Sequence, residues 1–204
     1  MTNRRGRPKS AEKRKSISQA AAELFLREGF DRCSMDSIAA AAGVSKQTVY
    51  SHFANKDELF RSCITSKAEL YDLRIDPALH TSLDSGLRSF ADGFLRLISD
   101  PQAVKMWRLM MSEADTHPHV AAMFDETGPD DSLRSLQRFL ASHGDRLQTK
   151  DYEAMARTFL ALAADTWHTR ILLGVIQRVE DDERRRHVER IVRQFGTLFG
   201  NPDG

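Results

Sequence analysis

The chain has 204 residues, of which 41% are hydrophobic, enough for one domain or two modest ones with a buried core. Its net charge of +1 hides an asymmetry, because residues 1–60 hold 11 Lys and Arg against 7 Asp and Glu, while the remainder holds 19 against 22. No apolar run approaches the roughly 20 residues that span a membrane, and the basic N-terminus lacks the apolar stretch of a secretory signal. We therefore expect a globular cytoplasmic protein without a cofactor.

The first 15 residues carry seven basic side chains and one acidic side chain, a composition suited to a polyanion. We predict a disordered basic arm over residues 1–14. Within it, Arg5-Gly6-Arg7-Pro8 has the form of an AT-hook core, in which glycine lets two arginines lie along a narrow minor groove. The alternative is a solubilising tail, but the position before the first helix favours minor-groove contact by Arg5 and Arg7.

Apolar residues recur at helical spacing through most of the chain, and no segment alternates between hairpin turns, so the predicted fold is all-α. The first helix follows the arm and ends at Gly29, which can adopt a left-handed conformation. Two short helices are predicted over residues 35–42 and 46–53, separated by a three-residue turn. Ser34 and Ser45 are the predicted N-caps of these two helices.

The spacing of small and β-branched residues in these two helices is typical of a helix-turn-helix. Ala39 lets the two helices approach closely, and Gly43 permits the backbone angle that reverses the chain. Val49 is predicted to pack underneath the crossing. The second helix is therefore predicted to present its opposite face to DNA.

Residues at the start of such a recognition helix reach base edges in the major groove. Gln47 can pair with adenine, Lys46 can reach guanine or a phosphate, and the methyl group of Thr48 can contact thymine. Other hydrogen-bond donors nearby are predicted to hold phosphates, which set the register without reading sequence. This predicted set is Ser34, Ser45, Tyr50, Ser51, His52 and Lys56. For Tyr50 the alternative is a core aromatic side chain, and we favour contact with DNA.

Residues 10–60 resemble the DNA-binding head of TetR/AcrR transcriptional regulators. The resemblance rests on Ile38-Ala39, on residues 42–53 and on residues 56–60. It implies a homodimer that binds a palindromic operator, usually represses transcription and leaves the DNA when an effector binds the C-terminal body. Gln47 stands where many relatives have a small residue, so the operator sequence is not implied.

The remainder of the chain is predicted to form a C-terminal helical bundle. A fourth helix is predicted from about residue 56 to 75, where Asp76-Pro77 ends it. Further helices are predicted over about 83–98, 101–114, 118–126, 132–142, 150–174 and 188–199. The predicted architecture is a three-helix helix-turn-helix head plus this bundle, with about nine helices in total. The predicted domains are the arm over 1–14, the DNA-binding domain over 15–60 and a ligand-binding and dimerisation domain over 61–204.

Two features of the bundle predict its partners. Apolar stripes on the two long terminal helices predict a homodimer, and the alternative is that both stripes are buried within one subunit. A set of methionine and aromatic residues predicts a pocket for an apolar or aromatic effector, although for each residue alone the alternative is a packed core. The predicted lining is Phe94, Met106, Trp107, Met110, Met111, Met123, Phe124, Met155, Phe159 and Asp165.

Other chemistry-bearing residues point to no further activity. Asp115, His117 and His119 alternate in a loop, a pattern more often solvated than metal-binding, so no metal site is predicted. Cys33 and Cys63 lack the spacing of a disulfide framework or zinc module, and we expect both to be buried. The chain has no Gly-x-Ser-x-Gly elbow, phosphate-binding loop or His-Glu-x-x-His pair, so we predict that it is not an enzyme. A protein that coats DNA without specificity is the second alternative, for which a recognition helix would be superfluous.

Overall fold

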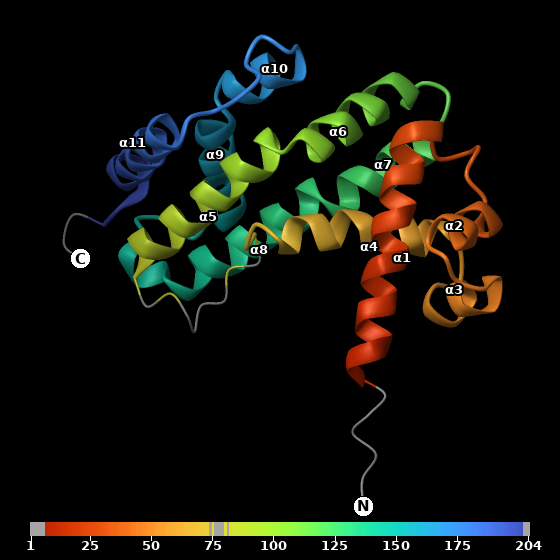
Figure 1. The fold of residues 1–204 in the computed structure, drawn as a ribbon. Coiled ribbons are helices and arrows are strands. Elements are labelled where there is room, and N and C mark those ends of the chain that lie inside the picture. The colour runs from red at the N-terminus through yellow and green to blue at the C-terminus, as the bar shows by residue number, and fades with distance from the viewer. Residues whose placement is uncertain (1–6, 74, 76–79, 81, 202–204) are drawn as a thin grey trace, which may run out of the picture. The chain divides into compact units, whose positions relative to one another are not determined.

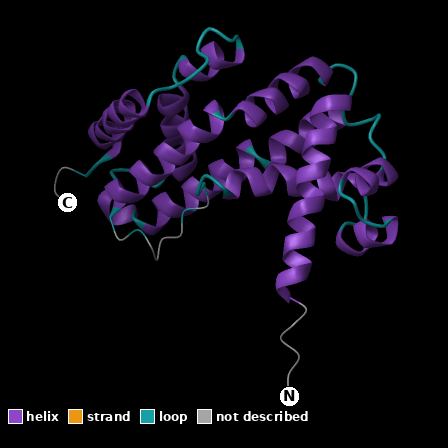
Figure 2. Ribbon diagram, viewed as in Figure 1, coloured by secondary structure: helices purple, strands orange, loops and turns teal. Residues whose placement is uncertain are grey.

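The computed structural model describes residues 7–73, 75, 80 and 82–201. These residues form eleven α-helices and one 3₁₀ turn and contain no β-strand (Figure 2). The predicted all-α fold is therefore confirmed. No helix in this part of the chain combines the length and apolarity that crossing a bilayer requires.

The chain divides into two compact units. The first comprises the described residues of Met1–Ser66 together with Leu109–Thr127, and the second those of Lys67–Arg108 and Gly128–Gly204. Leu109–Thr127 thus groups with the N-terminal helices, although it falls within the predicted C-terminal domain. One reason is that Arg61 donates hydrogen bonds of 3.0 Å to Glu126 and to Thr127.

The first unit is built on a packed set of helices. These are α1 (Arg7–Glu28), α2 (Met35–Ala41), α3 (Lys46–His52), the larger part of α4 (Lys56–Glu69), the end of α6 (Pro101–Glu113) and α7 (Pro118–Thr127). Figure 1 shows α2 and α3 in orange as two short helices joined by a tight turn. The core is apolar, with Phe25 and Phe60 fully buried and their ring centroids 5.5 Å apart.

The predicted disordered arm is wrong for its second half, because α1 begins at Arg7. Pro8 lies in the first turn of the helix, where its missing N–H breaks no intrahelical hydrogen bond. The residues that follow, from Ala11 to Lys15, are good helix formers and extend the helix backwards from its buried stripe. Arg5 lies outside the described residues, as does the side chain of Arg7.

The caps and turns around α2 and α3 form as predicted. The hydroxyl of Ser34 accepts a 3.0 Å hydrogen bond from the N–H of Ser37, and that of Ser45 accepts one of 3.1 Å from the N–H of Thr48. Gly43 has a φ of +65°, so it adopts the left-handed conformation that the turn between the helices requires.

The helix predicted to reach residue 75 ends earlier, because α4 stops at Glu69. The N–H groups of Tyr71 and Asp72 bond three residues back, to Ala68 and Glu69, which tightens and closes the helix. Asp72 then takes a φ of +53°, a conformation that few non-glycine residues adopt.

The second unit is a bundle around α5 (Leu83–Ser99), which packs against α8, α9, α10 and α11. These helices span Pro129–Ser142, Tyr152–Ala164, Trp167–Leu172 and Asp181–Phe199, and the 3₁₀ turn η1 spans Gly144–Arg146. Phe90, Phe139, Phe159 and Phe195 are fully buried in its core. These four side chains come from α5, α8, α9 and α11, and the same core also contains Val104 of α6 and Trp167 and Ile171 of α10.

Three helix boundaries in the second unit differ from the prediction. The helix predicted to start at about residue 188 begins at Asp181. The single helix predicted over 150–174 is divided into α9 and α10, because Asp165 takes a φ of +42° and its carboxylate accepts the N–H of Thr166. The start predicted at Ser132 lies at Pro129 instead, since proline is well suited to the first position of a helix.

Candidate functional site

The short helix α3 has one face in the core and one face in solvent. Val49 is fully buried, whereas Lys46 and Gln47 are exposed and Thr48 is half-buried. Tyr50 is 47% exposed, which places its ring at the surface and not in the core. The predicted base-reading residues are therefore brought together at the N-terminal end of one solvent-facing helix.

Two contacts orient the start of α3. The Nζ atom of Lys46 lies 2.8 Å from a carboxylate oxygen of Asp36 in α2, and this ion pair raises the pKa of Lys46 through its hydrogen bond and charge. The hydroxyls of Ser45 and Thr48 lie 2.8 Å apart. Because the Lys46–Asp36 pair is exposed, it is weak and its partners can be exchanged.

The end of α3 is held by α1. Arg14 donates a hydrogen bond to the carbonyl of His52, lies 4.1 Å from the centre of the Phe53 ring and pairs with Glu58 at 3.6 Å. The hydroxyl of Ser51 donates to the carbonyl of Thr48 at 2.7 Å. The guanidinium group of Arg14 therefore holds the C-terminal end of α3, the helix predicted to contact the bases.

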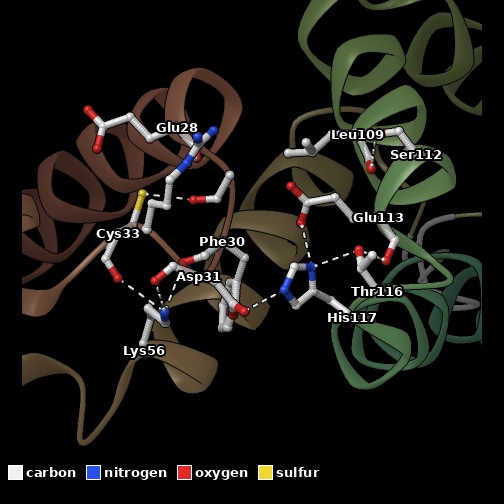
Figure 3. Close-up of polar contacts among 12 residues, drawn as sticks. Glu28, Phe30, Asp31, Cys33, Lys56, Leu109, Ser112, Glu113, Thr116 and His117 are labelled. Atoms are coloured by element: carbon white, nitrogen blue, oxygen red, sulfur yellow. Dashed lines mark hydrogen bonds and ion pairs between the residues drawn. The ribbon is translucent and has the colours of Figure 1, made fainter.

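Lys56 is turned toward the connection between α1 and α2. Its Nζ atom lies 2.8, 3.4 and 3.1 Å from the carbonyl oxygens of Phe30, Asp31 and Cys33, and 4.2 Å from the centre of the Phe30 ring. An ammonium group has three N–H donors, and these three carbonyls engage all of them. The side chain that was predicted to hold a phosphate therefore caps the residue 29–33 turn in this structure (Figure 3).

The same turn is contacted from another side by the segment between α6 and α7 (Figure 3). His117 lies between two carboxylates, with Nε2 2.5 Å from Asp31 and Nδ1 3.6 Å from Glu113. Gly29, with a φ of +84°, has no side chain, and a Cβ atom there would lie 2.8 Å from Glu113. One Glu113 oxygen is buried and accepts no hydrogen bond from any described residue.

In this geometry the imidazole of His117 contacts the carboxylates of Asp31 and Glu113. Asp115 and His119 are exposed, and no group of three or more histidine, cysteine or acidic side chains in the described part of the chain is placed to hold a metal ion. Cys33 and Cys63 are both buried, as predicted. Burial raises the pKa of both thiols, that of Cys63 to about 12.

The predicted ligand-lining residues fall in both units. In the second unit Met106, Met155 and Phe159 are buried, and Phe94 and Trp107 are half-buried. Asp165 is exposed and pairs with Arg190 at 3.3 Å. In the first unit Met110, Met123 and Phe124 are buried, whereas Met111 is 63% exposed. The lining therefore stays a prediction, and Met111 lies at the surface of its unit.

Several polar residues with buried or paired side-chain atoms were not predicted from the sequence. These are the Asp31–His117–Glu113 cluster, the Lys67–Asp100–Tyr71 cluster and His168. The spacing of Glu113 and His117, four residues apart at the end of a helix, was the one local signal for the first cluster. Lys67 and Tyr71 are also four residues apart, but the Asp100 carboxylate that both contact is distant in sequence.

The fold and the two-faced α3 define a helix-turn-helix protein with a helical C-terminal body. Residues 17–63 match the family model described as bacterial regulatory proteins, tetR family. Residues 85–201 match that of the AefR-like transcriptional repressor, C-terminal domain, and this match alone spans more than half of the chain. The chain belongs to the TetR family of bacterial regulatory proteins, which confirms the predicted resemblance.

Individual relatives agree with this assignment. The transcriptional activator FasR of Mycolicibacterium smegmatis is 34% identical over 124 residues, 59% of this chain and 56% of FasR. A TetR-family structure from Mesorhizobium loti is 28% identical with a TM-score of 0.74, over 94% of this chain and 98% of that one. The flavonoid-responsive regulator FrrA is 31% identical with a TM-score of 0.72, over 94% and 99% of the two chains.

The match to FasR spans about half the length of that curated relative, and the match to the regulator YdeS of Bacillus subtilis spans 34% of its length. The family and these relatives are transcriptional regulators and not enzymes, in agreement with the prediction.

Proposed function

We propose that the protein is a cytoplasmic repressor that binds a palindromic operator as a homodimer and is released by a small apolar or aromatic effector. The observation that carries the proposal is the division of α3 into a buried face and an exposed face. Val49 anchors the helix, while Lys46 and Gln47 project from its first turn. Helices of this kind enter the major groove with their first residues toward the bases.

Each residue at the start of α3 has a distinct proposed role. Gln47 pairs with adenine, and the methyl group of Thr48 contacts thymine. Lys46 exchanges its exposed pairing with Asp36 for guanine or a phosphate, at small cost because the pair is solvated.

The proposed phosphate contacts surround this reading face. They are Ser34, Ser45, Tyr50, Ser51 and His52, of which all but the half-buried His52 are exposed. Lys56 contributes differently from the prediction, because its donors are engaged by carbonyls of the turn that precedes Ser34. We therefore assign to Lys56 the positioning of that turn. Arg5 and Arg7 remain proposed minor-groove contacts.

The proposed dimer uses the outward surfaces of α9 and α11. Most of their apolar stripes are buried within the second unit, where Phe159 and Phe195 are fully covered, whereas Leu198 near the end of α11 is 54% exposed. On the outward face of α9, Ala154 and Ala161 are exposed and small enough for another helix to approach.

The exposed charges of α11 also favour pairing with a second copy. Its first turn carries Asp181, Asp182 and Glu183, of which Asp181 and Asp182 pair with Arg184 and Arg185 of the same helix, and Arg190 and Arg193 lie further along the exposed surface. A two-fold antiparallel arrangement sets the acidic end of one helix against the basic part of the other. Two heads held in this way read two half-sites and gain affinity.

Two observations support an aromatic effector and repression of transcription as the mode of regulation. FrrA is named as flavonoid-responsive, and we extend an aromatic effector to this chain because of the methionine and aromatic residues of its body. The C-terminal family model is that of a repressor, which favours repression, whereas FasR is named an activator. A promoter fusion in which the gene is deleted separates the two, because loss of a repressor raises expression.

The experiment that tests the proposal is nuclease footprinting of the purified protein on the intergenic region beside its own gene. We expect protection of one palindromic segment, and loss of that protection when an aromatic effector is added. Uniform coating of the fragment at every concentration would instead indicate a packaging protein. Turnover of the added compound in the absence of DNA would indicate an enzyme.

A further inference from the structure

His168, in α10 of the second unit, has a buried nitrogen with no partner. Its Nε2 atom is shielded from solvent and makes no hydrogen bond to any described residue. Burial lowers the pKa of His168 below its ordinary value, which favours the neutral imidazole. Buried polar atoms in folded proteins nearly always have a hydrogen-bond partner, so this nitrogen calls for one.

His187, the other histidine packed beside a tryptophan in this unit, provides the contrast. It stacks on Trp167 with ring centroids 4.4 Å apart, and its Nε2 lies 3.0 Å from the carbonyl oxygen of Ala163. Its Nδ1 is contacted by Arg190. A structural histidine in this bundle is therefore satisfied by its own unit, whereas the Nε2 of His168 is not.

Trp107 of α6 packs edge-on against the ring of His168. The ring centroids of Trp107 and His168 are 5.0 Å apart at an interplanar angle of 79°. The next residue, Arg108, donates hydrogen bonds of 2.9 and 3.0 Å to the carbonyls of Leu172 and Ile171 at the end of α10. These bonds hold α6 against α10, so the two rings are kept next to each other.

We propose that His168 Nε2 is the hydrogen-bonding anchor of the effector, that Trp107 is its aromatic wall, and that the effector is an uncharged aromatic molecule with a hydroxyl group. This inference rests on the proposed effector-responsive function. A hydroxyl group is both a donor and an acceptor, so it satisfies either tautomer of a neutral imidazole. A charged group beside a buried neutral ring would lose its hydration without gaining an opposite charge.

The rival explanation is that an Nε2–H group points at the face of the Trp107 ring, an arrangement that the edge-on geometry of the two rings permits. Under this explanation the histidine serves packing alone. A hydroxyl group on a bound molecule would then add nothing through His168, and this difference makes the two explanations separable.

The test is calorimetric titration of the full chain with 7-hydroxyflavone and with flavone, which differ by one hydroxyl group. We expect the wild type to bind 7-hydroxyflavone about tenfold more tightly than flavone. His168→Phe keeps a ring but removes both nitrogens, and it should bind the two compounds equally. His168→Gln keeps a neutral hydrogen-bonding group and should restore part of the preference. His119→Gln, an exposed control in the other unit, should behave as the wild type does.

The outcomes separate this inference from the proposed function. Wild-type protein that binds neither compound, or a His168→Phe variant that retains the preference, overturns the inference. If His168→Phe fails to fold in a melting experiment, His168→Gln replaces it and should show a preference about threefold smaller than that of the wild type; an unchanged preference overturns the inference. Operator footprinting of the same variants should give unchanged protection without ligand. Loss of specific protection by the wild type itself would instead refute the proposed function.

Discussion

The Nε2 atom of His117 lies 2.5 Å from Oδ2 of Asp31, which joins the segment before α7 to the turn between α1 and α2. Lys56 caps carbonyl groups of the same turn (Figure 3). The turn ends at Ser34, the N-cap of α2. The position of the helix-turn-helix within the first unit therefore depends on polar contacts from α4 and from the segment that follows α6.

Breaking the His117–Asp31 contact should lower the free energy of unfolding by about 0.5–1 kcal/mol, a small value because the two side chains are 29% and 49% exposed. Chemical denaturation of His117→Gln, Asp31→Asn and the double variant measures this loss. The double variant should lose less than the sum of the single variants. Strict additivity would show that the two side chains do not interact.

Gln47 and Val49 should separate DNA reading from folding. Gln47→Ala removes an exposed side chain, so its melting temperature should stay unchanged while operator affinity falls by about 1–3 kcal/mol. Val49→Ala removes two methyl groups from a fully buried site and should cost about 2 kcal/mol of stability. Paired melting and operator titrations check both variants. An unchanged operator affinity for Gln47→Ala would remove its assigned role.

The stability of the second unit should depend on the charge of Asp100. Burial raises the pKa of this carboxyl group, but hydrogen bonds from Lys67, Ala103 and Tyr71 outweigh it, and the net pKa is lowered. A carboxyl group whose pKa is lower in the folded state than in the unfolded state stabilises the fold at pH values above the unfolded-state pKa. This stabilisation is lost as the pH falls through the folded-state pKa.

Asp100→Asn should therefore be less stable than the wild type at pH 7, and this difference should shrink in acid, below about pH 4. The Asn side chain can still cap the start of α6, so the loss reports the ionic contacts with Lys67. Thermal melting across this pH range is the measurement. A constant difference between the two proteins at all pH values would contradict the assignment.

Arg5 and Arg7 should contribute to affinity through the flanks of the operator. Replacing both with alanine should weaken binding mainly to operators with A·T-rich flanks, because a narrow minor groove attracts arginine. Titrations with A·T-rich and G·C-rich flanks around the same operator measure the difference. Equal losses on both duplexes would remove the minor-groove role.

A bulky charged side chain on the outward face of α9 should disrupt the proposed dimer. Ala161→Arg should shift sedimenting protein toward the monomer and reduce operator affinity, since one head alone makes fewer contacts. Ala122→Arg changes another exposed alanine, in α7, and serves as the control. If both variants sediment as the wild type does, the interface lies elsewhere.

Local signals carried most of the fold prediction. Serine before a helix and glycine after one have direct steric and hydrogen-bonding reasons, and Ser34, Ser45 and Gly43 act as predicted. The breaks at Asp72 and Asp165 were missed because both are non-glycine residues with positive φ, a state that tertiary packing imposes and a local pattern does not mark.

The site was only partly predictable for a related reason. The exposed face of α3 follows from helical periodicity, and so does the burial of Val49. The inward turn of Lys56 and the contact of His117 with Asp31 depend on residues distant in sequence. Similarly, the apolar stripe of α11 was placed correctly, but it packs against α5 and α9 of the same unit, whereas the sequence predicts pairing with a second copy of the chain.

The most direct test is to titrate the protein against the footprinted palindrome and against a duplex that keeps one half-site, with chain stoichiometry measured by sedimentation. Two chains should bind the full duplex, and affinity for the half-site should be at least about a hundredfold weaker. A single chain that binds both duplexes with equal affinity would contradict the account of α3 as one of two paired reading helices.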